Sequence, residues 1–297
     1  MKILLFGKNG QLGWELQRSL APLGELISLD EVGNQYCGDF LNLDGIAKTV
    51  REIAPDIIVN AGAYTAVDKA QTESELARTL NALAPAVLAE EAERLGAWMI
   101  HYSTDYVFDG SGDKPWKETD TANPLSVYGK TKLDGDLAIR QSGCKHLIFR
   151  TSWVYAARGV NFAKTMLRLA QERDQLNVIS DQFGAPTGAD LLADVTAHSL
   201  LQAMRHPEVS GLYHIAASGE TTWYDYASFV IESARSAGSR IKVTSESLRP
   251  IPSSAYPTPA PRPKNSRLDT RKLQDTFNLT LPRWQIGVSR MLTEIGE

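Results

Sequence analysis

The segment Lys2-Ile-Leu-Leu-Phe6 runs directly into Gly7-Lys-Asn-Gly10-Gln-Leu-Gly13, and this stretch decides the fold. Its first part is mostly apolar and contains no turn former, which predicts a buried parallel strand. After the glycines, apolar residues recur at the spacing of one helical face: Leu12, Leu16, Leu20 and Leu23. The chain therefore begins with a strand, a glycine turn and a helix.

The three glycines suit the binding of a dinucleotide. A helix start presents unpaired N–H groups and the positive end of the helix dipole, which stabilise a pyrophosphate that the backbone can approach closely. By this interpretation Gly7 permits the tight turn, Gly10 the approach to phosphate and Gly13 the close packing of helix on strand. The spacing is Gly-x-x-Gly-x-x-Gly, not the Gly-x-Gly-x-x-Gly of many dehydrogenases, so an ordinary strand-to-helix turn is the alternative.

Composition places the chain among ordinary globular proteins. Its 297 residues suffice for a sizeable core and for two domains. The net charge of −4 and the lack of a Lys- or Arg-rich block give no case for a nucleic-acid or membrane partner. Cys37 and Cys144 are the only cysteines, which fits a reducing, cytoplasmic location. No apolar run approaches the ~20 residues of a membrane span, and the histidines lack metal-ligand spacing.

An acid closes the second predicted strand, Glu25–Asp30. Asp30 stands where a carboxylate typically accepts hydrogen bonds from the adenosine ribose, although a turn aspartate at a strand end is the alternative. A carboxylate there disfavours a 2′-phosphate and favours NADH, whereas the nearby Lys8 offsets this and keeps NADPH open. Asp39-Phe40 follows a third short run and either contacts the adenine or begins the next helix.

Strands and helices continue to alternate, which predicts an α/β fold with a doubly wound parallel sheet. Asp56–Asn60 reads as a fourth strand and runs into the small residues of Ala61–Thr65, which leave space for a cofactor. Residues 74–95 read as a helix with an acidic face. Trp98–Ser103 reads as a fifth strand, followed by Thr104-Asp105.

The pattern Tyr128-x-x-x-Lys132 follows this fifth strand. Residues four apart share one face of a helix, so a phenol and an ammonium can meet the same ligand. A free tyrosine titrates near ~10, and a neighbouring cation is expected to lower that pKa and make Tyr128 a usable acid. A chance surface pair is the alternative, and the position after a nucleotide-binding start favours chemistry.

Several motifs together resemble the extended short-chain dehydrogenase/reductases, and within them the dTDP-4-dehydrorhamnose reductase family. They are Gly7-x-x-Gly10-x-x-Gly13, Ser103-Thr-Asp-Tyr-Val-Phe-Asp-Gly110, Tyr128-x-x-x-Lys132, Arg150-Thr-Ser-Trp-Val-Tyr155, Asp181-Gln-Phe-Gly-Ala-Pro-Thr187 and Leu281-Pro-x-Trp284. The resemblance spans essentially the whole chain. It implies reduction of the C4 keto group of dTDP-4-dehydro-L-rhamnose by NADH or NADPH, the last step to dTDP-L-rhamnose for O-antigen and other bacterial cell-surface polysaccharides.

The resemblance also implies roles for individual residues. Tyr128 would donate the proton, Lys132 would assist it and bind the nicotinamide ribose, and Thr104 would hold the carbonyl oxygen. Together with the glycine pattern, the cofactor contacts are expected at Gly7, Gly10, Gln11, Leu12, Gly13, Asp30, Asp39, Phe40, Ala63, Tyr64, Thr65, Tyr102, Tyr128 and Lys132. Sugar contacts are expected at Thr104, Asp105 and Trp153.

Two other functions remain alternatives. A non-catalytic, NAD(P)-binding regulatory subunit has the same fold, as in the regulatory subunit of methionine adenosyltransferase, but here Thr104, Tyr128 and Lys132 are all intact. A sugar-nucleotide epimerase or dehydratase is the other. Dehydratases of the wider family carry further acid after the threonine, whereas Tyr106 follows Asp105 here.

The second half of the chain is expected to supply a smaller α/β substrate domain. The NAD(P)-binding Rossmann domain is assigned to residues 1–152 and roughly 181–210, and the sugar-nucleotide domain to roughly 153–180 and 211–297. Pro250–Pro263 holds six of the 14 prolines, so no regular helix is expected there. This loop is either a stiff surface segment or a cover of the site whose Arg262 or Lys264 meets a diphosphate.

The family resemblance further implies a homodimer and an association with Mg²⁺. Exposed acids such as Glu15, Asp190 and Glu294 are candidates for the metal, and the sequence does not choose among them. The metal ligands are therefore left unknown.

Overall fold

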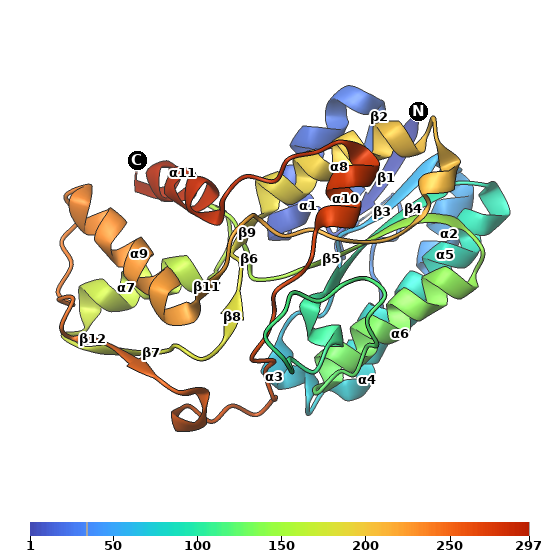
Figure 1. Ribbon diagram of the computed structural model, residues 1–297. Coiled ribbons are helices and arrows are strands. Elements are labelled where there is room, and N and C mark those ends of the chain that lie inside the picture. The colour runs from blue at the N-terminus through green and yellow to red at the C-terminus, as the bar shows by residue number, and fades with distance from the viewer. Residues whose placement is uncertain (34, 297) are drawn as a thin grey trace.

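The computed structural model describes residues 1–33 and 35–296, and within them six strands form one parallel sheet (Figure 1). The strand order is β10 (Gly211–His214), β5 (Lys145–Thr151), β4 (Trp98–Thr104), β3 (Ile57–Asn60), β1 (Lys2–Phe6) and β2 (Glu25–Leu29). The chain winds outward from β1 in both directions, so the order reverses between β1 and β3. Ligands of such sheets bind at that point, at the carboxyl ends of the strands.

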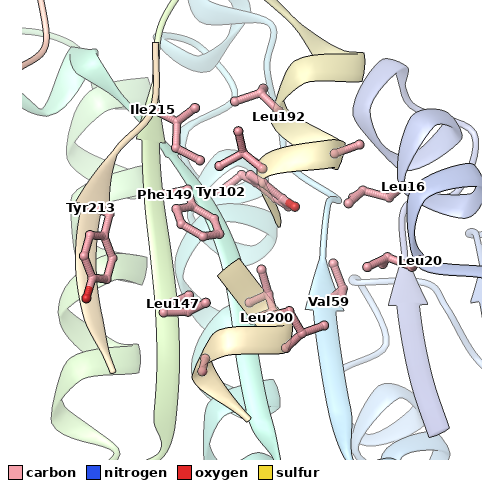
Figure 2. Packing of buried hydrophobic residues seen from close by; sticks show 14 of the residues in the cluster. Leu16, Leu20, Val59, Tyr102, Leu147, Phe149, Leu192, Leu200, Tyr213 and Ile215 are labelled. Atoms are coloured by element: carbon pink, nitrogen blue, oxygen red, sulfur yellow. The ribbon is translucent and has the colours of Figure 1, made fainter. Parts of the chain in front are cut away.

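Helices cover both faces of the sheet (Figure 1). One face packs against α1 (Gln11–Leu20), α8 (Ala189–Ala203) and α10 (Arg271–Phe277). Figure 2 shows Leu16 and Leu20 of α1 and Leu192 and Leu200 of α8 on this face, where Phe149 also packs. The other face packs against α2 (Leu43–Ile53) and α5 (Ala84–Leu95), with α6 (Val127–Gln141) beside α5.

Burial on both faces explains why the strands read as continuous apolar runs. In β1, Ile3 and Leu5 pack toward α1 and α8, while Leu4 and Phe6 pack toward α2 and α5. All four side chains are fully buried. The predicted first strand, glycine turn and first helix are confirmed, as are the strands at β2, β3, β4 and β5.

A smaller unit lies beside the sheet (Figure 1). Its helices are α7 (Phe162–Glu172), α9 (Trp223–Ser236) and α11 (Trp284–Gly296). Its strands form short pairs: β7 (Leu176–Ile179) with β12 (Leu248–Ile251), β8 (Phe183–Gly184) with β11 (Thr221–Thr222), and β6 (Val154–Tyr155) with β9 (Thr187–Gly188). Pro250–Pro263 is the end of β12, a single helical turn and extended loop, as the proline density predicts.

The remaining elements are short. They are α3 (Val67–Ala70), α4 (Ser74–Arg78), the π-helix η2 (Thr79–Leu83), and the 3₁₀ turns η1 (Ala21–Leu23), η3 (Asp105–Val107), η4 (Pro207–Val209) and η5 (Ser253–Ala255). Across the described residues, the helices lack the combination of length and apolar character needed to cross a bilayer.

The structure corrects two expectations about the sheet. The described residues ahead of Asp39 form bends and loop, so that run is no strand, and the predicted fourth and fifth strands are the third and fourth, β3 and β4. Residues 211–214, expected in the substrate domain, form β10 and pair with β5 in the main sheet. Hydrogen bonding across about 60 intervening residues leaves no local sequence signal, which is why periodicity alone misplaced this strand.

Gly13 makes the closest contact of the glycine turn. A Cβ at Gly13 would lie 2.0 Å from the Gly7 carbonyl oxygen, whereas one at Gly10 would lie at an ordinary 3.5 Å. We therefore expect Gly13→Ala to destabilise the fold by about 1–3 kcal/mol, as overpacking does, and to lower Tm by several degrees. Gly10→Ala is the matched control and keeps Tm close to wild type. Equal Tm values for the two variants would contradict the packing role of Gly13.

Candidate functional site

The carboxyl ends of β1, β3, β4 and β5 open onto a cavity of about 610 Å³ at the point where the strand order reverses. The cavity is lined by most of the predicted site residues: Gly7, Gly10, Gln11, Leu12, Asp30, Asp39, Phe40, Ala63, Thr65, Tyr102, Thr104, Asp105, Tyr128, Lys132 and Trp153. One cavity thus joins the glycine turn, the Tyr-x-x-x-Lys pair and the tryptophan, which lie far apart in the sequence.

The glycine turn brings backbone donors to this cavity. Gly7 has a φ of +84°, and a Cβ there would lie 2.6 Å from the backbone nitrogen of Gly62 after β3. Gly10 is the N-cap of α1, and in the described structure no side chain hydrogen-bonds as a cap. The first N–H groups of α1 therefore remain available to an anion, which is the arrangement that a dinucleotide pyrophosphate requires.

Two residues of the predicted cofactor set lie outside the cavity lining. Gly13 packs beneath the Gly7 carbonyl, so it shapes the turn. The hydroxyl of Tyr64 points to the surface and donates to Glu73, while its backbone bonds to the Asn81 side chain. The Tyr64 hydroxyl therefore points away from the cavity that Ala63 and Thr65 line, and contact of Tyr64 with a cofactor stays a prediction.

Asp30 lies at the end of β2 in the cavity wall, as predicted. Lys8 Nζ lies 3.4 Å from Asp30 Oδ2, and the Asn9 amide donates to the same carboxylate. The Asp30 carboxylate can accept a hydrogen bond from a ribose hydroxyl, and the neighbouring Lys8 ammonium can pair with a 2′-phosphate. Asp39 also lines the cavity, in the turn before α2, with Oδ1 accepting from the Leu41 N–H at 2.9 Å. Asp39 therefore does not begin the next helix, whose N-cap is Asn42, and contact of Asp39 and Phe40 with the adenine stays a prediction.

The candidate catalytic residues come from the end of β4 and the first turns of α6. Ser126 caps α6 by accepting from the Gly129 N–H at 3.2 Å, which places Tyr128 in the first turn. The Thr104 hydroxyl oxygen accepts from the Tyr106 N–H at 3.1 Å. The Tyr106 ring meets the Tyr128 ring edge-on, with 5.5 Å between centroids. These contacts hold the phenol beside the threonine at the cavity floor.

Burial, and not the lysine, dominates the titration of Tyr128. Burial raises the pKa of Tyr128 to about 12, with hydrogen bonding to Thr104 opposing the rise. The expected lowering by Lys132 is therefore wrong for this structure. Lys132 Nζ instead donates to the Tyr102 carbonyl at 2.6 Å, and burial lowers its own pKa to about 8. Tyr128 accordingly stays a neutral phenol throughout the physiological range, as a proton donor must.

Asp105 is a second group whose titration is shifted by burial. Asp105 directly follows Thr104, the last residue of β4, and is the first residue of η3. The Thr104 hydroxyl donates to Asp105 Oδ1 at 3.2 Å. Burial raises the pKa of the Asp105 carboxyl to about 7, while hydrogen bonds from Ser266 and Thr104 oppose the rise. Perturbed carboxyl groups in a cleft are typical of functional sites. Asp105 therefore changes its charge close to neutral pH.

A second tryptophan, Trp223, also lines the cavity. Trp223, the first residue of α9, stacks on Trp153 with 3.6 Å between ring centroids and 14° between planes. Trp153 has a φ of +49°, unusual for a bulky residue, and a Cβ at Gly184 would lie 2.6 Å from its indole. No local pattern marks Trp223, because only folding of the smaller unit brings it to Trp153.

The basic residues at the end of the proline-rich loop contact carboxylates and do not line the cavity. Arg262 Nη2 lies 2.8 Å from Asp68 Oδ2, and Lys264 Nζ lies 3.0 Å from Asp181 Oδ2. The Arg262–Asp68 pair ties the loop to α3 across the chain. Contact of Arg262 or Lys264 with a diphosphate stays a prediction.

The three candidate metal-binding acids do meet, in a second cavity of about 210 Å³ between α1, α8 and α11. Glu15, Asp190 and Glu294 line it, but so do two arginines, and Arg290 Nη1 lies 3.7 Å from Asp190 Oδ2. Among the described residues no group of three ligating side chains is arranged to hold a metal ion. The site of one chain therefore does not fit Mg²⁺ by itself.

Comparison with known proteins gives concordant matches. The chain matches the family described as RmlD substrate binding domain over residues 1–296. It is 62% identical over 295 residues to the dTDP-4-dehydrorhamnose reductase of Escherichia coli K12, covering 99% of this chain and 98% of that protein. A dTDP-4-dehydrorhamnose reductase structure from Clostridium acetobutylicum has a TM-score of 0.88 at 36% identity and covers 100% of both chains. One from Bacillus anthracis, in complex with NADP, has a TM-score of 0.86 at 31% identity and covers 99% of both.

The Asp30 contacts predict how the site distinguishes two dinucleotides. Asp30→Ala removes an acceptor for a free 2′-hydroxyl and releases Lys8 to meet a 2′-phosphate. We expect the variant to bind NADH at least tenfold more weakly, the loss of about one charged hydrogen bond, and NADPH as well as wild type or better. Titration of both dinucleotides measures this, with the exposed Asp113→Asn as control. Equal losses for the two dinucleotides would mean that Asp30 does not contact the ribose.

Proposed function

The chain belongs to the dTDP-4-dehydrorhamnose reductase family, and we propose that it is an oxidoreductase that reduces the C4 keto group of dTDP-4-dehydro-L-rhamnose to dTDP-L-rhamnose. This reaction is the last step of dTDP-rhamnose synthesis for cell-surface polysaccharide. The observation that carries the proposal is the meeting of Thr104, Tyr128 and Lys132 with the glycine turn in one cavity.

The proposed mechanism uses each of these residues. Bound NADH or NADPH supplies the hydride, and the glycine turn at the start of α1 suits its pyrophosphate. On substrate binding the Thr104 hydroxyl, which donates to Asp105 Oδ1 in this structure, would turn its one O–H to the substrate carbonyl oxygen and hold that oxygen near Tyr128. Tyr128 donates its proton to the oxygen as negative charge develops there, and the Lys132 ammonium stabilises the phenolate that remains.

Trp153 and Trp223 are proposed to form the apolar wall against which the 6-deoxysugar lies. Stacked indoles present a flat face, which suits the hydrogen-bearing face of a sugar ring, and an indole N–H can donate to a sugar oxygen. The Trp223 N–H already donates to Gln182 Oε1 at 3.1 Å, so the Trp153 N–H is the candidate donor. Asp105, beside Thr104, is the proposed acceptor for a sugar hydroxyl.

Two observations extend the proposal beyond the active site. Cys37 and Cys144 are both free, which supports a reducing, cytoplasmic location. The acids Glu15, Asp190 and Glu294 line an open cavity that lacks the ligand set for a metal within one chain, so a homodimer that brings further ligands is the arrangement in which Mg²⁺ would fit. We propose that residues 153–180, with most of 215–297, form the sugar-nucleotide part.

One assay separates the proposed reductase from its two alternatives. The reductase consumes one reduced dinucleotide for each 4-keto sugar. An epimerase or dehydratase regenerates its cofactor and consumes none. A regulatory subunit converts neither the dinucleotide nor the sugar. We therefore test for a stoichiometric loss of NADH or NADPH absorbance on adding dTDP-4-dehydro-L-rhamnose. Product formation without net consumption of the dinucleotide would overturn the proposal, and so would binding without turnover.

Tyr128→Phe removes the proposed proton donor while keeping the buried ring. We expect kcat to fall by about 10² or more, the usual contribution of a general acid, with dinucleotide affinity nearly unchanged. Steady-state kinetics and dinucleotide titration measure both quantities. Tyr224→Phe is the control, because this tyrosine lies in α9 outside the cavity lining. Wild-type turnover by Tyr128→Phe would remove the tyrosine from the mechanism.

Asp105 predicts a pH dependence whose sign follows from its role as an acceptor. Below its raised pKa of about 7 the carboxyl is protonated, and above it the carboxylate can accept from the sugar. We expect kcat/KM to rise with pH through this range. In Asp105→Asn, which cannot titrate, the rise should disappear. A rise of the same size in both proteins would assign it to another group.

A further inference from the structure

A row of buried polar side chains includes Lys132 and begins at Asn60, which also lines the cavity. It comprises Asn60 at the end of β3, His101 in β4, Lys132 and Asp136 in α6, and Arg150 in β5, with exposed fractions of 1%, 0%, 2%, 0% and 3%. The mechanism above uses only the lysine. Burying polar groups this completely costs free energy unless they hydrogen-bond to one another. The distances within the row therefore indicate which atom of each side chain donates and which accepts.

The backbone fixes the orientation of the first member. The N–H of Gly62 can only donate, and it donates to Asn60 Oδ1 at 3.1 Å. The amide nitrogen of Asn60 therefore faces His101 and lies 3.0 Å from its Nδ1. Since the amide nitrogen is a donor, Nδ1 must accept, and a neutral imidazole that accepts at Nδ1 carries its hydrogen on Nε2. Burial together with the charge of Lys132 holds the pKa of His101 well below its ordinary value, so the ring is neutral.

The fixed tautomer determines what His101 can offer to Lys132. Its Nε2 lies 3.2 Å from Lys132 Nζ and 4.0 Å from Asp136 Oδ1. An ammonium has no acceptor, so the Nε2–H can bond to Lys132 only when the lysine is an uncharged amine. When Lys132 is charged, the remaining acceptor near the Nε2–H is Asp136 Oδ1, which at 4.0 Å lies beyond hydrogen-bond distance and has no hydrogen-bond partner within the described chain. The Nε2–H of His101 therefore has an acceptor within hydrogen-bond distance only when Lys132 is an uncharged amine.

The other groups around Lys132 leave this choice open. The Tyr102 carbonyl of β4 accepts from Nζ at 2.6 Å in either state. From α6, Asp136 favours the charged form, but its Oδ2 already accepts from Arg150 Nε at 3.0 Å. Tyr128, one helical turn earlier on α6, lines the same cavity as Lys132. Lys132 thus lies between Asp136, which favours the charged ammonium, and His101, which favours the uncharged amine.

We propose that His101 is the positioning residue that stabilises the uncharged form of Lys132, so that this lysine exchanges a proton with Tyr128 during turnover. After Tyr128 has given its proton to the substrate oxygen, an N–H bond of the Lys132 ammonium breaks and the O–H bond of Tyr128 re-forms. The amine that remains accepts from the His101 Nε2–H. A solvent proton restores the ammonium when product leaves, so the cycle balances.

The tautomer is tested directly on the unmodified protein, without reference to its activity. Long-range ¹H–¹⁵N correlation spectra of ¹⁵N-histidine-labelled protein distinguish the two tautomers, and the His101 signals are those that His101→Leu lacks. We expect a neutral ring protonated at Nε2 across the pH range in which Lys132 titrates. A ring protonated at Nδ1, or a charged ring, would overturn the proposal.

The kinetic test rests on the proposed reductase function. In wild type, kcat/KM should fall above pH 8, because Lys132, with its pKa of about 8, loses its charge there. His101→Leu removes the donor to the amine, so this fall should move upward by about one pH unit, the worth of one hydrogen bond. His101→Gln, whose amide N–H can replace the Nε2–H, should return it toward the wild-type position.

His214→Leu is the matched control. His214 is as fully buried as His101, but it lies in β10 and bonds to the Trp116 carbonyl. It should lower Tm without moving the pH profile. A His101→Leu variant that loses only Tm, with an unmoved profile, would make His101 a plain core residue. Absence of reductase activity in wild type, with the Nε2–H tautomer present, would instead overturn the proposed function and leave the tautomer result standing.

Discussion

The close approach of three backbone segments at Gly7 is the constraint on which the rest of the structure depends. The Gly7 carbonyl sits where a Cβ of Gly13 would be, and the Gly7 Cα faces the backbone of Gly62. These contacts draw α1 and the end of β3 against the end of β1. Because the order of the strands reverses there, the cavity and the free N–H groups of α1 coincide. Any larger side chain at these glycines would open that junction.

Burial controls the chemistry of the site more than ion pairing does. The same low-dielectric environment raises the pKa of Tyr128 and of Asp105 and lowers that of Lys132. Each shift moves the group toward its uncharged form. The cavity is thus lined by a neutral phenol, a carboxyl that titrates near neutrality and a lysine that loses its charge easily. A site of this kind is suited to proton donation.

The smaller unit supplies an aromatic wall to the cavity at the end of the sheet. Trp153 leaves β5 in a left-handed backbone conformation, and it stays there because Gly184 gives it room and Trp223 stacks on it. Trp223 is held by Gln182 and packs on Phe162 and Tyr226. The aromatic cluster between α7, α9 and α11 therefore fixes the position of Trp223, which lines the cavity.

The sequence by itself determined the parts whose signal is local. The strand, glycine turn and helix at the N-terminus, the acid at the end of β2 and the Tyr128–Lys132 pair on one helix all follow from spacing and periodicity. Tertiary structure alone decided the rest: β10 in the main sheet, the outward Tyr64, Trp223 against Trp153, and His101 against Lys132. Each of these depends on residues distant in the chain or on which way one side chain points. Such contacts are selected by packing and desolvation after the elements form, and they leave no periodic pattern in the sequence.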